Sequence, residues 1–258
     1  MQSDCSSRWR AAGALTVMVL GTAIAVAGTE TATSAPGSGA APTTGAAPQA
    51  STAQSRLKVK VGGLSADGRL PVSAAYCPPA KMDPARYNIS PSVSWSRGPA
   101  GTRSYALIMT DLDVPKDLSL INKPGATITA DTPRVPFIHW VLVDIPPSIT
   151  RLRTGEESAG FVLKGKPFGP TDHGVRGANV YTFFYPKDSD LAGPRGGYDG
   201  PCPPHNDLVP HRYVTYVYAL DVATLGLSGL FFGEDAQRAM QGHILASGEA
   251  DASYSAAP

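Results

Sequence analysis

The alternation of hydrophobic and polar positions along the chain is that of a β-rich protein. Residues 57–61 alternate apolar and charged side chains, as a strand with one buried face requires. Residues 104–110 and 137–145 are mostly apolar, which favours strands buried on both faces. Residues 181–185 and 213–218 are aromatic and β-branched, which also favours strands. Five strands are therefore predicted in these runs, with clusters of glycine and proline between them.

A helical pattern stands near the C-terminus. Glu234 and Asp235 place negative charge where a first helical turn would begin, and apolar residues follow at helical spacing as far as Leu245. Gly248 is a typical residue for the end of such a helix. Strands joined by long loops and followed by a late helix predict a mainly β fold, a β-sandwich with peripheral helices.

The first 55 residues differ in composition from the rest of the chain. In residues 1–27, two arginines precede a run of small apolar residues that ends in a small-x-small cleavage signal, which predicts a signal peptide. The alternative is an uncleaved N-terminal membrane anchor, for which the run is short. Residues 28–55 lack large apolar side chains and are predicted to be a flexible linker.

These boundaries leave residues 56–258 as one globular domain, large enough for a sizeable core. The protein is expected to be secreted or held in the cell envelope, with no stable membrane span once the signal peptide is removed. The formal net charge is +1, and the basic residues are scattered, so no nucleic-acid partner is predicted. Common hydrolase, metalloprotease, redox and nucleotide-binding motifs are absent from the sequence, so neither an enzyme nor a cofactor is predicted.

Two cysteines, Cys77 and Cys202, remain after the predicted signal peptide. An exported pair in an oxidising compartment indicates one disulfide. The alternative is two free thiols, because a sequence does not place two Cα atoms within bridging distance.

Acidic, histidine and tyrosine side chains stand at the ends of three predicted strands. They are Asp111, Asp113, His139, His211 and Tyr213. The loop Gly200-Pro201-Cys202-Pro203-Pro204 precedes the last two of them. Prolines fix the backbone of such a loop and its glycine allows close approach, so the pattern predicts a rigid loop at the mouth of a sheet.

Several motifs in this order resemble the phosphatidylethanolamine-binding protein (PEBP) family, in its bacterial Raf kinase inhibitor-like (YbhB/YbcL-type) branch. They are Asn88–Pro91 with Trp95, Asp111–Pro115, His139–Trp140, Gly200–Pro204, His211–Tyr213 and Gly242–Ala246. The resemblance implies a large antiparallel sheet packed on a smaller one. It also implies that the aspartates and histidines line a small pocket for a phosphate-like anion.

The residue types indicate how such a pocket would work. His139, His211 and the Tyr213 hydroxyl are predicted to donate hydrogen bonds to the anion, with a backbone N–H of the Gly200-Pro201 turn. Asp111 and Asp113 would repel an anion, so they are predicted to orient a histidine or to face an ammonium group.

The leading hypothesis is an exported binding protein for a phosphate-bearing small molecule or a phospholipid head group such as phosphoethanolamine. Two alternatives remain: a protein-interaction module that inhibits a kinase or protease, and a zinc-dependent hydrolase that uses the Asp/His cluster. The chain departs from the family pattern in a longer segment, 174–197, with an apparent extra strand or hairpin, and in the link 205–210. Both are expected beside the pocket.

Overall fold

The computed structural model of the 258-residue chain describes residues 55–78 and 81–256. The predicted signal peptide, residues 1–27, and the predicted linker up to residue 54 lie outside the described residues. In the part of the chain that is described, no helix has the length and apolar character needed to cross a membrane.

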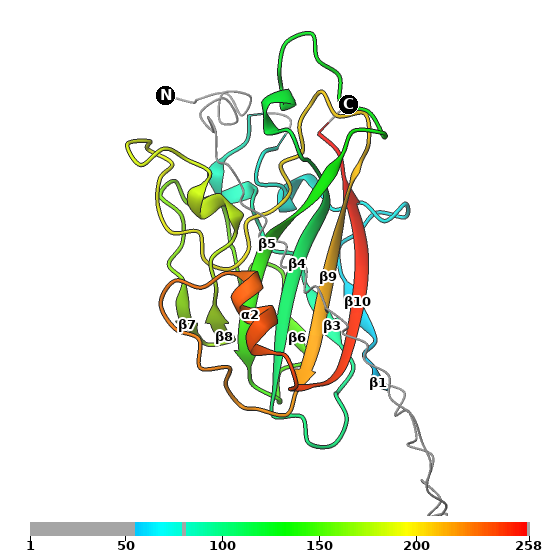
Figure 1. The fold of residues 1–258 in the computed structure, drawn as a ribbon, viewed down its shortest axis with the longest axis vertical. Helices are drawn as coiled ribbons and strands as arrows, with labels where there is room; N and C mark the ends of the chain where they lie inside the picture. Colours follow the sequence, from blue (N-terminus) through cyan, green and yellow to red (C-terminus); the bar gives the residue numbers. More distant parts are fainter. Residues whose placement is uncertain (1–54, 79–80, 257–258) are drawn as a thin grey trace, which may run out of the picture. The chain divides into compact units, whose positions relative to one another are not determined.

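Seven strands form the larger sheet, in the order β1-β10-β9-β4-β5-β8-β7 (Figure 1). They are β1 (Ser55–Arg56), β10 (Ile244–Tyr254), β9 (His211–Leu220), β4 (Ser104–Pro115), β5 (Arg134–Ile145), β8 (Gly174–Arg176) and β7 (Gly169–Thr171). Neighbouring strands run antiparallel, except that the short β1 pairs parallel with β10. The predicted runs at 104–110, 137–145 and 213–218 form the three adjacent strands at the centre of this sheet.

Three short strands form the smaller sheet, in the order β2-β3-β6. They are β2 (Val59–Val61), β3 (Val93–Trp95) and β6 (Arg151–Leu152). Trp95 and Leu152 of this sheet share one buried cluster with Leu107, Trp140 and Val217 of the larger sheet. The two sheets therefore enclose the main core, and the predicted β-sandwich is confirmed.

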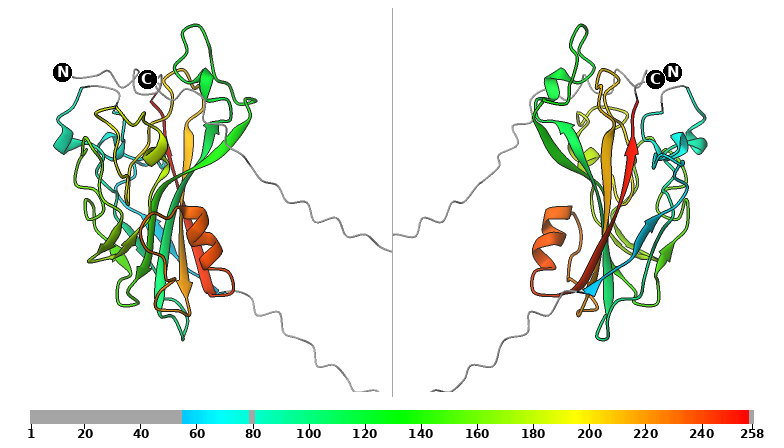
Figure 2. Two further views of the ribbon diagram at one scale, coloured as in Figure 1. Left: turned by 60° about the vertical axis from the view of Figure 1, so that its left-hand side comes forward. Right: turned by 90° about the vertical axis from the view of Figure 1, so that its right-hand side faces the viewer.

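The helix α2 (Gly233–Ala239) covers the opposite face of the large sheet. Ala236 of α2 and Met240, the residue directly after the helix, pack on Ile108 of β4 and Val141 of β5. Figure 2 shows α2 and the smaller sheet on opposite sides of the large sheet. Short 3-10 helices lie in the connections: η2 (Val72–Ala74), η3 (Pro84–Arg86), η4 (Leu118–Leu120) and η5 (Val180–Phe183).

Two of the predicted elements were wrong. The aromatic run 181–185 is not a strand: η5 covers its start, and the Asn179 side chain accepts a hydrogen bond from the Tyr181 N–H at the head of this helix. The predicted C-terminal helix ends at Ala239 rather than near Gly248, and β10 begins at Ile244. A Cβ at position 248 would lie 2.1 Å from the Leu57 carbonyl oxygen, so this glycine serves close strand packing rather than a helix stop.

Candidate functional site

The candidate site lies at one end of the large sheet, where β9 begins beside Asp111 of β4 and Phe137 of β5. Asp111 of β4 pairs with Phe137 of β5 on one side and with Tyr213 of β9 on the other. His211 is the first residue of β9. Antiparallel pairing therefore brings together residues that are up to 100 positions apart in the sequence.

A β-bulge turns His139 toward the site. Consecutive β4 residues pair with Ile138 and Trp140, which leaves His139 between them as an extra residue of β5. Ile138 packs on the α2 side of the sheet and Trp140 packs between the sheets. The His139 ring lies 5.4 Å from that of Tyr213, a residue of the core between the sheets. The bulge thus places the consecutive side chains of His139 and Trp140 on the same side of β5.

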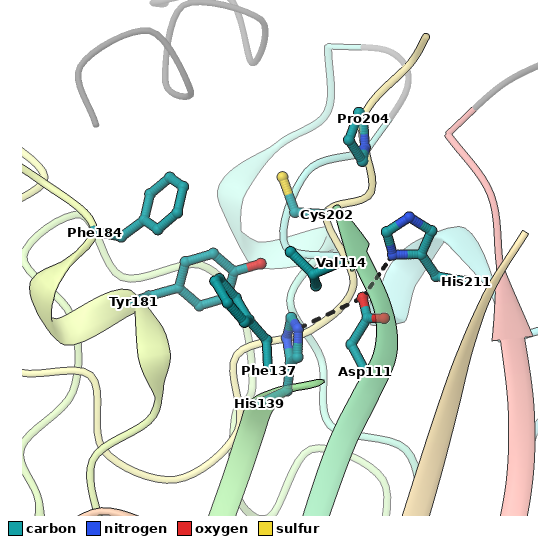
Figure 3. A pocket seen from close by; sticks show the side chains of 9 residues that line it. All are labelled: Asp111, Val114, Phe137, His139, Tyr181, Phe184, Cys202, Pro204 and His211. Carbon is teal, nitrogen blue, oxygen red and sulfur yellow. Dashed lines mark hydrogen bonds and ion pairs between the residues drawn. The ribbon is translucent and has the colours of Figure 1, made fainter. Parts of the chain in front are cut away.

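A small pocket opens at this point (Figure 3). Its cavity volume is about 10 Å³, room for about one water molecule, and about 280 Å³ of empty space lies around this point when the open solvent at the mouth is included. Its lining residues are Asp111, Val114, Phe137, His139, Tyr181, Phe184, Cys202, Pro204 and His211. One side of the pocket is formed by carboxylate and imidazole groups, whereas Phe137, Tyr181 and Phe184 form an aromatic side.

His139 reaches the pocket with one ring nitrogen already fixed. Its Nδ1 lies 2.9 Å from the Asp199 carbonyl oxygen and 3.1 Å from that of Gly200. Both partners are acceptors, so Nδ1 carries a hydrogen, and the Nε2 of the neutral ring is an acceptor. Burial lowers the pKa of His139 below its ordinary value, and the charge of Asp111 opposes only part of that effect. His139 is therefore neutral at pH 7.

His211 is held between two carboxylates. Its Nδ1 lies 2.8 Å from Asp111 Oδ2, and its Nε2 lies 3.1 Å from Asp207 Oδ2. Burial by itself lowers the pKa of this histidine, but the hydrogen bonds to both carboxylates raise it to about 9. His211 is thus a charged residue at neutral pH, and both of its N–H groups are engaged within the protein.

Asp207 has a second cationic partner in Arg134. Arg134 Nη1 lies 2.5 Å from Asp207 Oδ2, and Nη2 lies 3.1 Å from Oδ1. Burial acts to raise the pKa of Asp207, but hydrogen bonds from His211 and Arg134 lower it to about 2. Asp111 and Asp207 together balance the positive charges of His211 and Arg134.

A second buried network lies behind His139 and centres on the Asp199 carboxylate, which is fully buried. Lys166 Nζ donates to its Oδ1 at 2.5 Å, and the Asn88 side-chain amide donates to the same oxygen at 2.7 Å. The Asn179 amide donates to Oδ2 at 3.0 Å. This network fixes the chain at Asp199 and Gly200, whose carbonyls orient His139.

Gly200 and Pro201 serve this loop rather than the pocket surface. The Gly200 N–H donates to Asn88 Oδ1 at 2.9 Å, so the predicted anion donor is already used. The Pro201 carbonyl accepts the Tyr76 N–H at 2.8 Å. A glycine is required at position 200 because a Cβ there would lie 1.9 Å from the carbonyl oxygen of Ala74.

We expect Gly200→Ala to lower the free energy of unfolding by about 3 kcal/mol, because the added methyl group meets backbone that cannot move freely. Urea denaturation of the variant measures this loss. Gly63→Ala is the control, because Gly63 has a φ of +78° but no atom lies within 4 Å of the position that a Cβ would take there. We expect that variant to lose about 1 kcal/mol from backbone strain alone. Equal losses in the two variants would contradict the close approach of Gly200 to Ala74.

Cys77 and Cys202 are joined by a disulfide with 4.8 Å between their Cα atoms. Cys202 also lines the pocket. The bond ties the segment after η2 to the proline-rich loop, so a covalent link lies directly behind one wall of the pocket.

The remaining predicted residues lie beside the pocket. Asp113 Oδ2 accepts the Arg212 N–H at 2.7 Å, and Asp113 does not line the pocket. Tyr213 is fully buried under His139, and burial, followed by the charge of Asp111, raises its pKa well above the ordinary value. The structure therefore gathers Asp111, His139 and His211, but not Asp113, into one cluster. Within the described residues, no group of three or more His, Cys, Asp or Glu side chains has the arrangement of a metal site.

Several residues of this site escaped sequence reasoning. They are Arg134, Lys166, Asn179, Asp199 and Asp207. Asp207 belongs to the 205–210 link, whose departure from the family pattern was the available signal. Asp199 directly precedes the Gly-Pro-Cys-Pro-Pro loop, but its burial depends on partners from three distant segments.

The family model described as phosphatidylethanolamine-binding protein matches residues 63–255. The chain belongs to the phosphatidylethanolamine-binding protein family. A UPF0098 protein of Methanothermobacter thermautotrophicus is 33% identical over 167 residues, which cover 63% of this chain and 83% of that protein. The predicted PEBP resemblance is confirmed.

Two crystal structures show the same PEBP fold. A PEBP homologue from Chlamydia trachomatis has a TM-score of 0.52 at 24% identity, and the match covers 77% of this chain and 97% of that one. YbcL of Escherichia coli, described as a member of the mammalian PEBP family, has a TM-score of 0.54 at 21% identity, with 78% and 99% covered. These likenesses support the fold of this PEBP-family binding protein.

Proposed function

We propose that this protein binds a phosphate-bearing small molecule or phospholipid head group, such as phosphoethanolamine, in the pocket between β4, β5 and β9. The observation that carries the proposal is the His139 ring, which lines the pocket with its Nδ1 fixed by two carbonyls and its Nε2 3.9 Å from Asp111 Oδ2. A phosphate oxygen that shares a proton with this Nε2 makes a strong, charge-assisted hydrogen bond. The aromatic side of the pocket receives the organic part of the ligand.

We further propose that the protein acts after export. The predicted signal peptide in residues 1–27 supports this, and so does the disulfide between Cys77 and Cys202, which suits an oxidising compartment. Periplasmic or secreted recovery of the full chain, with its N-terminus cut near residue 28, would support export. Recovery of the uncut chain in the cytoplasm, with both cysteines reduced, would contradict it.

Calorimetric titration with phosphoethanolamine and with free ethanolamine tests the ligand. We expect binding that requires the phosphate and that is weakened about tenfold or more in His139→Gln, which loses the shared proton. His243→Gln is the matched control, because His243 binds Asp221 beyond the end of α2, away from the pocket. Equal binding by the two variants, or binding of ethanolamine alone, would refute the proposal.

The proposed contact also predicts proton uptake on binding. Burial keeps the pKa of free His139 below its ordinary value, and the second pKa of a phosphate ester is about 6, so at pH 7 to 8 neither free partner holds the shared proton. Each pH unit above both values should therefore weaken phosphoethanolamine binding about tenfold. His211 stays charged across this range, since its pKa is about 9. Titrations at pH 7 and 8, in two buffers of different ionisation enthalpy, measure this. Binding that is flat or that strengthens with rising pH would contradict it.

A further inference from the structure

Asp207 does not line the pocket itself, but its Oδ2 lies 3.1 Å from Nε2 of His211, which does. We propose that Asp207 is a specificity-determining residue that makes the pocket favour a singly charged phosphate group, as in a phosphodiester, over a doubly charged phosphate monoester. It does so as an internal counter-ion that engages His211 in place of the ligand. This inference rests on the proposed function and adds the charge class of the ligand.

The first argument is the number of donors on His211. A charged imidazole has two N–H groups, and these lie 2.8 Å from Asp111 and 3.1 Å from Asp207. His211 is 1% exposed, so it does not reach a ligand past these partners. The cation that would otherwise attract a second negative charge on the ligand is therefore already neutralised.

The second argument is that Asp207 is held firmly in this position. Besides Arg134, its Oδ1 accepts the Val209 N–H at 3.0 Å. The neighbouring Asn206 donates its side-chain amide to the carbonyls of Leu120 and Ala126, each at 3.0 Å. An incoming phosphate would have to break this arrangement in order to displace the Asp207 carboxylate from His211.

The third argument is the charge balance. Asp111 and Asp207 supply two negative charges, and His211 and Arg134 supply two positive charges. A ligand dianion entering beside Asp111 meets no net positive charge from these four groups, so its second charge has to be neutralised by the proton that it takes up and shares with His139. Removal of the Asp207 charge makes this group more positive by one unit, and removal of the Arg134 charge makes it more negative by one unit; Asp113, whose charge also acts on Arg134, is the same in both variants.

The test uses two full-length variants that break the same ion pair with opposite effects on charge. Asp207→Asn and Arg134→Gln are titrated at pH 6.5, well below the pKa of about 9 that His211 has in the wild-type protein. The probes are phosphoethanolamine, whose phosphate is mostly dianionic, and glycerophosphoethanolamine, whose phosphodiester carries one negative charge. Both probes carry the same ammonium group and differ in phosphate charge and in the glycerol group, so each variant is compared with the wild type for the same probe.

We expect Asp207→Asn to strengthen phosphoethanolamine binding about tenfold and glycerophosphoethanolamine binding about threefold, because the gain scales with ligand charge. Arg134→Gln should weaken phosphoethanolamine binding by the larger factor, for the same reason. If both variants weaken both ligands alike while the wild type binds, the two residues act only as scaffold and this inference is overturned. If Asp207→Asn does not fold, equal losses for the two probes in Arg134→Gln overturn it as well. If the wild type binds neither probe, the proposed function itself fails.

Discussion

Asp199→Ala should lower the free energy of unfolding by about 3 to 5 kcal/mol, the cost expected when one partner of a buried ion pair is removed. The Asp199 carboxylate is fully buried and binds Lys166 at 2.5 Å. Its loss leaves the Lys166 ammonium without its counter-ion, and that side chain is only 10% exposed. The two asparagine amides that now donate to the carboxylate would lose their acceptor as well.

Urea denaturation measures this loss, and Asp188→Ala is its control because Asp188 is exposed on the 174–197 segment, which precedes Asp199. The double variant Lys166→Met/Asp199→Leu should recover part of the loss, since it removes both charges together. A single-variant loss below about 1 kcal/mol, typical of exposed pairs, would contradict the burial of this network. Phosphoethanolamine binding should weaken in the folded fraction, because Asp199 and Gly200 orient His139.

Removal of the disulfide should cost about 5 kcal/mol of unfolding free energy in the chain-entropy model. Cys77 and Cys202 are 125 residues apart, so the bond restrains a large part of the unfolded chain. The comparison is Cys77→Ala/Cys202→Ala against the oxidised parent, both carrying Cys5→Ala so that no third thiol exchanges. Chemical denaturation of the two proteins gives the difference.

A second measurement separates stability from pocket geometry. Cys202 lines the pocket, so the double alanine variant should also bind phosphoethanolamine more weakly at temperatures where it remains folded. Reduction of the parent with a thiol should reproduce both effects. A stability loss below about 1 kcal/mol would show that the bond does little to restrain the unfolded chain.

The sequence predicted those parts of the fold that depend on local pattern. Continuous apolar runs at 104–110 and 137–145 can be accommodated only by burial, and the structure places them in the two central strands β4 and β5. The motifs likewise predicted the family. Each motif alone is weakly specific, but their order and spacing along the chain together are specific. Local pattern failed at 181–185, where the residues have high strand propensity but the run begins in a 3-10 helix, with the Tyr181 ring stacked on that of Tyr76.

The residues of the candidate site were also predicted only in part from the sequence. Asp111, His139 and His211 were predicted because each stands at the end of a strand beside a recognisable motif. Their roles were decided by tertiary contacts: a bulge turns His139 inward, and Asp111 and Asp207 engage both nitrogens of His211, which was predicted to donate to the ligand. Asp199 is a polar residue of ordinary appearance in the sequence, and only its burial beside Lys166 gives it a function.

The sequence by itself therefore determined the family, the central strands and the residue types at the site. The tertiary structure decided the protonation states of His139 and His211, which of their nitrogens are engaged within the protein, and the charge balance around His211. The physical reason is that strand propensity and motif spacing are encoded by neighbours along the chain. A pKa and a donor's availability depend instead on burial and on charges contributed by distant segments. In this protein Asp111, Arg134 and Asp207 set the charge around His211, and they come from three different segments of the chain.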